Sequence, residues 1–105
     1  MQLIRGTLDI IVLKVLTWGP LHSFDVADRI STRFGGELAL EEGALYQSLR
    51  RMEERGWLTA EWGVSDNNRR ARYYRLTPQG RQQLRVETAS WERYSSALTR
   101  LLRAS

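Results

Sequence analysis

Apolar residues recur at helical spacing in the first part of the chain. The segment 7–18 is predicted to form a helix that ends at Gly19 and Pro20. Its apolar stripe is broad and contains Leu8, Ile11, Val12, Val15 and Leu16. A helix that is apolar on most sides is usually covered on most sides. We therefore expect a second subunit to supply part of this cover.

A second helix is predicted for the segment 23–34, with Ser23 as its N-cap and two glycines, Gly35 and Gly36, after its end. Its inward face is expected to consist of Phe24, Val26, Ala27, Ile30 and Phe34. The next four residues, 37–40, alternate between polar and apolar side chains. This pattern predicts either a very short strand or an extended lead-in to the following helix.

The stretch 41–57 predicts one amphipathic helix, which Gly56 closes. Its apolar face repeats at i, i+4 and i+7 and consists of Leu45, Leu49 and Met52. The opposite face carries groups that can touch the base edges and phosphates of nucleic acid, namely Tyr46, Gln47 and Arg50. Arg51 and Arg55 are expected instead to form ion pairs with glutamates of the same helix.

After this helix the apolar period changes from helical to alternating. The buried face of a first strand is predicted to consist of Leu58, Ala60 and Trp62. Residues 64–71 are rich in turn-forming Ser, Asp and Asn, and residues 72–76 alternate again, so the two strands form a hairpin. The neighbours Tyr73 and Tyr74 point to opposite faces of the second strand, which places one of them in the core.

Most of the net charge is located at this hairpin. The chain has 16 basic and 12 acidic residues and a net charge of +4, and residues 64–75 hold four arginines against Asp66, a local net charge of +3. Arginine binds phosphate through a planar fork of donors. The hairpin tip therefore suits a DNA backbone or minor groove, with Asn67, Asn68, Arg69 and Arg70 as candidate contacts. The alternative is a solvated edge whose charge discourages strand pairing.

A last helix is predicted to start with Thr77 as N-cap and Pro78 as first helical residue, and to run to about residue 103. At about 1.5 Å per residue its length is roughly 40 Å, more than a domain of this size needs for its own core. A heptad-like stripe along it contains Leu84, Thr88, Trp91, Ser95, Leu98 and Leu102. Such a stripe is typical of a helix that pairs with a second copy.

The length and composition favour one folded domain, or one domain plus an extension, without catalytic chemistry. Apolar residues make up 42 % of the 105 residues, and no apolar run is long enough to span a membrane. Cysteine is absent, which excludes disulfides and thiolate metal sites and fits a reducing cytoplasm. The one histidine, His22, is expected to be a structural hydrogen-bonding residue. Without a glycine-rich phosphate loop or a metal-ligand cluster, we expect no metal, no cofactor and no enzymatic activity.

The predicted order is helix, helix, short strand, helix, hairpin and long helix. This order is that of a mainly α winged helix-turn-helix with a small β-hairpin and a C-terminal extension. Over residues 8–80 the sequence resembles the PadR family of bacterial transcriptional regulators, and its single C-terminal helix is similar to the smaller subgroup of that family. The resemblance rests on the segments GTLDIIVLKVLTWGPLHSFDVADRI, LEEGALYQSLRRMEERGWL and NNRRARYYRLTPQGR.

The resemblance implies that the third helix enters the major groove of DNA while the hairpin lies along the backbone or in the minor groove. Tyr46 matches the family's helix tyrosine, and Gly43 permits close approach of the helix to the backbone. Three residues depart from the family pattern. Ser23 stands where the family usually has a glycine, Gln47 where it usually has a proline, and Arg50 where it often has a histidine. Because the last two lie on the outward face of the third helix, base preference cannot be carried over from relatives.

A single small DNA-binding domain makes few contacts with DNA. A specific DNA site is therefore usually bound by a dimer, whose two half-sites lie about 34–36 Å apart. We therefore expect a winged helix DNA-binding domain at residues 1–76 and a dimerisation helix at residues 77–105. The expected interface consists of Leu8, Ile11, Leu84, Trp91, Leu98 and Leu102. The alternative is a last helix that folds back on its own domain.

Trp91 has two interpretations. It either packs the dimer seam, which the spacing favours, or lines a pocket with Ser95 for a flat, aromatic effector, since members of the family are known as ligand-responsive repressors. The expected function is a cytoplasmic, nucleoid-associated repressor that binds a pseudo-palindromic operator in double-stranded DNA as a homodimer. The alternative is a winged helix that binds only other proteins.

Overall fold

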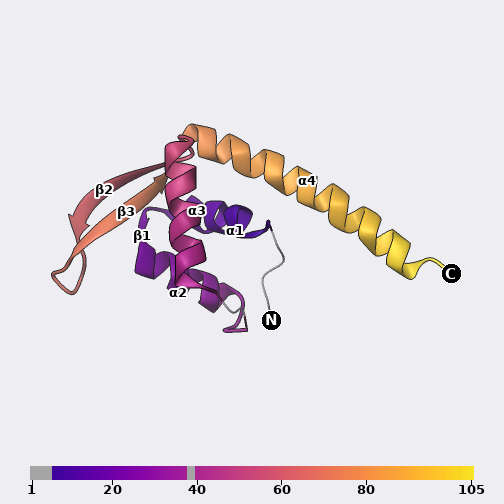
Figure 1. Cartoon of the computed structure of the whole chain (residues 1–105), viewed down its shortest axis with the longest axis horizontal. Helices are drawn as coiled ribbons and strands as arrows, with labels where there is room; N and C mark the ends of the chain where they lie inside the picture. The colour runs from indigo at the N-terminus through magenta and orange to yellow at the C-terminus, as the bar shows by residue number, and fades with distance from the viewer. Residues whose placement is uncertain (1–5, 38–39) are drawn as a thin grey trace.

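The structure is a computed structural model that describes residues 6–37 and 40–105. Four α-helices, one short 3-10 helix and three strands follow one another in the described residues (Figure 1). Their bounds are α1 Leu8–Val15, η1 Leu16–Trp18, β1 Leu21–His22, α2 Ser23–Arg33, α3 Glu42–Glu54, β2 Leu58–Val64, β3 Arg70–Leu76 and α4 Pro78–Arg103. The mainly α winged helix fold with a long C-terminal helix is therefore confirmed.

The core lies where α1, α2 and α3 meet the base of the sheet. The apolar face predicted for α3 is fully inside, since Leu45, Leu49 and Met52 are buried. They pack with residues of the other elements: Val12, Leu13, Val15, Leu16, Val26, Ile30, Leu58, Tyr74 and Leu76. Because α3 buries one side completely, its opposite side is left free on the surface of the domain.

The inward face predicted for α2 was partly wrong. Val26 and Ile30 are buried, but Phe24 is 74 % exposed, because its position in the first turn lies outside the stripe that meets the core. The predicted N-cap was also wrong by one residue. His22 caps the helix, and its Nδ1 accepts a hydrogen bond from the Asp25 backbone N–H at 3.3 Å. The expectation that His22 is a structural hydrogen-bonding residue is therefore confirmed.

The sheet has three antiparallel strands in the order β1–β3–β2, one strand more than the predicted hairpin. The third strand, β1, pairs with β3 through only two residues, Leu21 and His22. The prediction for 37–40, a very short strand or an extended lead-in to α3, rests on Leu38 and Ala39, which lie outside the described residues. β1 holds the start of α2 against β3, so the helices and the hairpin form one body.

The two tyrosines of β3 divide as predicted. Tyr74 is buried in the core, and burial raises the pKa of its hydroxyl above the usual value. Tyr73 lies on the outer face of the sheet, where its ring packs edge-on against His22 at 5.4 Å. β3 begins at Arg70, two residues earlier than the alternation indicated, so the hairpin is longer and its tip shorter than predicted.

The start of α4 is held firmly against the end of α3. Thr77 is the predicted N-cap, and its hydroxyl accepts from the Gly80 N–H at 2.9 Å and donates to the Gly56 carbonyl at 2.7 Å. Gly80 lies so close to Trp57 that a side chain at this position would overlap with the Trp57 carbonyl oxygen. From this junction α4 runs past the domain, as Figure 1 shows, and gives the molecule its longest dimension of 58 Å.

Candidate nucleic-acid interface

The free side of α3 carries the side chains that the sequence singled out. Tyr46 is 61 % exposed, and Gln47 and Arg50 are exposed beside it. Gly43 stands at the start of the helix with open space where a side chain would be. Arg50 makes an exposed ion pair with Glu54 at 3.7 Å, an interaction that contributes little and is easily exchanged for another acceptor. These four positions form one solvent-exposed face of α3.

α3 is fastened to α1 through one carboxylate. Asp9 accepts hydrogen bonds from the buried Ser48 hydroxyl at 2.6 Å and from the Arg51 guanidinium. The hydrogen bond to Asp9 also raises the pKa of Arg51. The prediction that Arg51 pairs within its own helix was wrong, because α1 brings a carboxylate closer. Arg55 lies over the Trp57 ring, and the pair within the helix is that of Arg50.

The hairpin of β2 and β3, residues 58–76, is called the wing below. Its tip is a tight loop. The Ser65 N–H donates to the Arg69 carbonyl at 2.8 Å, and the Asn68 N–H donates to the Ser65 carbonyl at 2.9 Å. Asn68 has a φ of 59°, a left-handed conformation that asparagine adopts more readily than most residues. Asn67, Asn68 and Arg69 are all exposed there. The loop therefore presents two amides and a guanidinium to solvent.

The base of the wing is joined to α3. An Arg72 guanidinium nitrogen donates to Glu53 Oε2 at 2.7 Å. The ring of Trp62, directly opposite Arg72 on β2, lies under Arg70 with 4.6 Å from its centroid to Arg70 Cζ. Trp62 was predicted to be buried, and this was wrong, because β2 extends beyond the core and the ring stays 60 % exposed. The wing and the free face of α3 are thereby held in one orientation.

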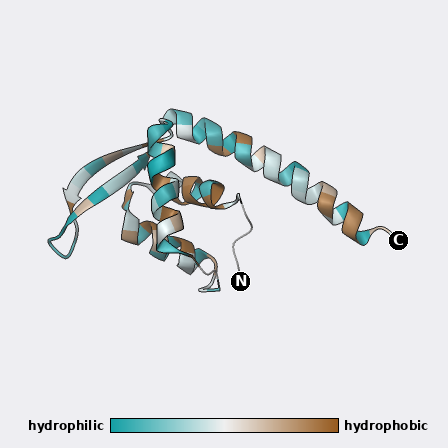
Figure 2. Ribbon diagram, in the orientation of Figure 1, coloured by the Kyte–Doolittle hydropathy of each residue, from teal (hydrophilic) through white to brown (hydrophobic). Residues whose placement is uncertain are grey.

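The far half of α4 exposes apolar side chains. Trp91, Tyr94, Leu98, Leu101 and Leu102 are all exposed in the single chain, and Figure 2 shows apolar bands in the last turns of this helix. Leu84, in contrast, packs against the protein's own core together with Leu8 and Ile11. The near half of α4 therefore belongs to the domain, and the far half has no cover among the described residues.

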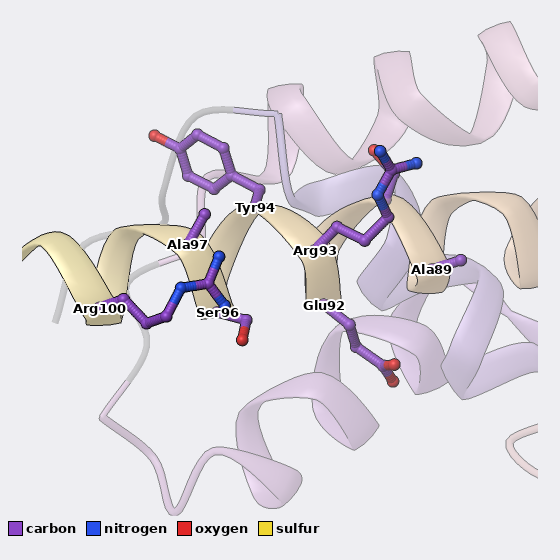
Figure 3. Close-up of a pocket in the computed structure, with 8 residues that line it drawn as sticks. Ala89, Glu92, Arg93, Tyr94, Ser96, Ala97 and Arg100 are labelled. Atoms are coloured by element: carbon purple, nitrogen blue, oxygen red, sulfur yellow. The ribbon is translucent and has the colours of Figure 1, made fainter.

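A shallow, open hollow runs along α4. Figure 3 shows that its lining comes from this helix alone, with Ala89 and Arg100 at its two ends and Arg93, Tyr94 and Ala97 between them. Trp91 and Ser95 do not line this hollow. The Trp91 ring lies 6.2 Å from the Tyr94 ring, so the two aromatic residues form one exposed pair.

Sequence reasoning missed three residues that organise this surface. Asp9 interrupts the apolar stripe of α1, and such a polar residue in an apolar helix can signal a buried partner. Glu53 and Trp62 carried no comparable signal, because their partners are arginines of β3, an element distant in sequence. The described residues include no helix long and apolar enough to cross a membrane.

Comparison with known proteins places this geometry in a family. Residues 12–86 match the model of the Transcriptional regulator PadR-like family. An uncharacterised protein of Lysinibacillus sphaericus is 31 % identical over 91 residues, which cover 86 % of this chain and 83 % of that protein. A transcriptional regulator from Clostridium thermocellum has a similar structure, with a TM-score of 0.86, 24 % identity and coverage of 94 % of this chain and 93 % of that one.

A further similar structure is that of Bacillus subtilis PadR in complex with operator DNA. It has a TM-score of 0.69 and 21 % identity, and the match covers 78 % of this chain but only 46 % of that one. At this identity the likeness shows the shared fold, so the operator complex is a property of that protein.

Proposed function

The chain belongs to the PadR-like family of transcriptional regulators, and we propose that it binds double-stranded DNA as a homodimer and represses transcription. One observation carries the proposal. The free face of α3 and the basic wing lie on one body, because Arg72 of the wing pairs with Glu53 of α3. A reading helix and a backbone-binding wing need this fixed relation to contact one stretch of DNA together.

Within this proposal α3 lies in the major groove. Tyr46 contacts a phosphate or a thymine methyl group, and Gln47 and Arg50 read base edges, for which amide and guanidinium groups have suitable donors and acceptors. Gly43 lets the helix start approach the DNA backbone closely. The wing residues Asn67, Asn68, Arg69 and Arg70 contact phosphates or the minor groove.

We assign residues 1–76 to DNA binding and residues 77–105 to dimerisation. The far half of α4 supports this, since Trp91, Leu98 and Leu102 are exposed on a helix that extends beyond its own domain. A contiguous exposed apolar surface on a small protein marks an interaction site. Leu8, Ile11 and Leu84 complete the proposed seam, although each already packs partly against the core.

An effector site at the same seam is a second part of the proposal. Trp91 and Tyr94 present two neighbouring rings, which can stack on a flat aromatic ligand, and Ser95 lies one turn away. The effector is tested by titrating the DNA complex with planar aromatic compounds. Such a compound is expected to release DNA from the wild type but not from Trp91→Ala.

We further propose that the protein acts on the nucleoid in the cytoplasm.

The main experiment selects bound fragments from the source genome and measures affinity for them across salt. Basic residues that bind DNA phosphates release counterions from the DNA, and this release is less favourable at high salt. A DNA-binding protein therefore loses affinity steeply as the salt concentration rises. The double variant Arg69→Ala/Arg70→Ala is expected to weaken binding to all sequences and to flatten the salt slope. If no fragment binds at low salt, the proposal fails and a protein-binding winged helix takes its place.

A further inference from the structure

The wing contains an arginine that is held by an aromatic ring instead of by a carboxylate. Within residues 6–37 and 40–105, Arg72 is paired with Glu53, whereas the contact made by the Arg70 guanidinium is with the ring of Trp62. The distance from Arg70 Cζ to the ring centroid is 4.6 Å, well inside the range of a cation–π contact. The charge of Arg70 is therefore restrained but not neutralised.

The arrangement follows from the register of the hairpin. Trp62 lies opposite Arg72, and Val64 lies opposite Arg70, so Trp62, Arg70 and Arg72 share one face of the sheet. Tyr74 and Leu58 continue the same face into the core. This is the side of the wing that is turned toward α3.

The ring itself is kept in place by a second contact. Arg72 Cζ lies 6.0 Å from the Trp62 centroid, and Arg72 is in turn bound to Glu53 of α3. A chain of contacts thus leads from α3 through Arg72 and Trp62 to Arg70. A guanidinium that lies over a ring face uses its π-system for that contact and keeps its N–H donors for other acceptors.

We propose that Trp62 is a positioning residue that holds the Arg70 guanidinium ready for a backbone phosphate of DNA. The inference rests on the proposed DNA-binding function and assigns a role to a residue outside the predicted contact set. A free arginine loses side-chain entropy when it binds. Because Trp62 already restricts Arg70 in the free protein, less of that entropy is lost on binding DNA.

The test is a double-mutant cycle on the full chain. Wild type, Trp62→Ala, Arg70→Ala and the double variant are titrated by fluorescence anisotropy with one duplex of about 25 base pairs that was selected for binding. An exposed cation–π contact predicts about a two- to fivefold loss of affinity per wing for Trp62→Ala, and this factor applies twice in a dimer. In the Arg70→Ala background the same substitution is expected to have almost no effect.

Two controls separate positioning from a merely structural role. Trp62→Phe keeps a ring under Arg70 and is expected to retain most of the affinity, whereas Trp62→Leu is expected to behave like Trp62→Ala. Arg75 is an exposed arginine on the opposite face of β3 and serves as the matched partner. Trp62→Ala is expected to cause its full loss in an Arg75→Ala background.

The outcomes distinguish the two proposals. If the wild type binds DNA and Trp62→Ala loses nothing, or loses equally in the Arg70→Ala background, the positioning role is wrong while DNA binding stands. Equal loss in both backgrounds means that Trp62 touches DNA itself or maintains the wing. If the selection recovers no duplex that the wild type binds, even at low salt, both proposals are overturned.

Discussion

Two helical glycines should respond in opposite directions to the same substitution. Gly80 is in the first turn of α4 and Gly43 is in the first turn of α3. A Cβ at Gly80 would lie 2.7 Å from Leu76 Cδ1 and still closer to the Trp57 carbonyl oxygen, but a Cβ at Gly43 would meet nothing within 4 Å. Steric space is therefore the variable that separates the two positions.

The magnitudes follow from three terms. Alanine is favoured over glycine in a helix by roughly 0.5–1 kcal/mol, and this term applies to both sites. At Gly80 the start of α4 must move away from Trp57, which costs about 1–3 kcal/mol as overpacking. The movement also breaks the hydrogen bond from the Gly80 N–H to Thr77, a cap worth about 1 kcal/mol. Gly80→Ala is thus expected to destabilise by about 2 kcal/mol, and Gly43→Ala to stabilise by roughly 0.5 kcal/mol.

Thermal unfolding followed by circular dichroism at 222 nm measures both effects. For a domain of this size 1 kcal/mol shifts Tm by roughly 4–8 °C, so Gly80→Ala should lower Tm by roughly 8–16 °C and Gly43→Ala should raise it by a few degrees. All proteins are compared at one protomer concentration, because dimerisation makes Tm depend on concentration. A Gly80→Ala variant as stable as the wild type would refute the close contact between α4 and Trp57.

Three further predictions concern the remaining contacts. Asp9→Ala should destabilise by about 1–3 kcal/mol in urea unfolding, since the buried Ser48 hydroxyl loses its acceptor, and Asp9→Ala/Ser48→Ala should lose less than the sum of the single variants. Leu98→Glu/Leu102→Glu should convert a dimer to monomers in sedimentation velocity while Tm stays above that of Gly80→Ala; an unchanged dimer would move the interface elsewhere. Arg50→Ala should relax preference at one base pair at a cost of about 1–3 kcal/mol, and a uniform loss across all operator variants would make Arg50 a phosphate contact instead.

The elements with strong local signals could be predicted from the sequence. The i, i+4, i+7 spacing of α3 identified which side is buried, and the same spacing left Tyr46, Gln47 and Arg50 outside. Thr77 and Pro78 marked the start of α4, since a hydroxyl cap and a proline in the first turn suit a helix N-terminus whatever surrounds it. Local chemistry was sufficient in these cases because the helix termini and faces depend on neighbours in sequence.

The strand β1 and the partners of the charged residues could not be predicted in this way. A strand of two residues has no period to detect, and it exists only because β3 is beside it. Trp62 alternates like a core residue, yet it is exposed because β2 continues past the edge of the core. Asp9 stands out in the sequence as a polar residue in an apolar helix. Its partner Ser48 could not be identified, because the two residues are 39 positions apart in the sequence.

The sequence by itself thus determined the order of the four α-helices and the hairpin, the buried side of the third helix and the concentration of positive charge at the hairpin. The tertiary structure alone decided how these parts are held together: α1 fastens α3 through Asp9, Arg72 joins the wing to Glu53, and Trp62 holds Arg70. The physical reason is that helix period, capping and charge content are properties of adjacent residues. Ion pairs and ring contacts between elements depend on distances in space, which the fold sets.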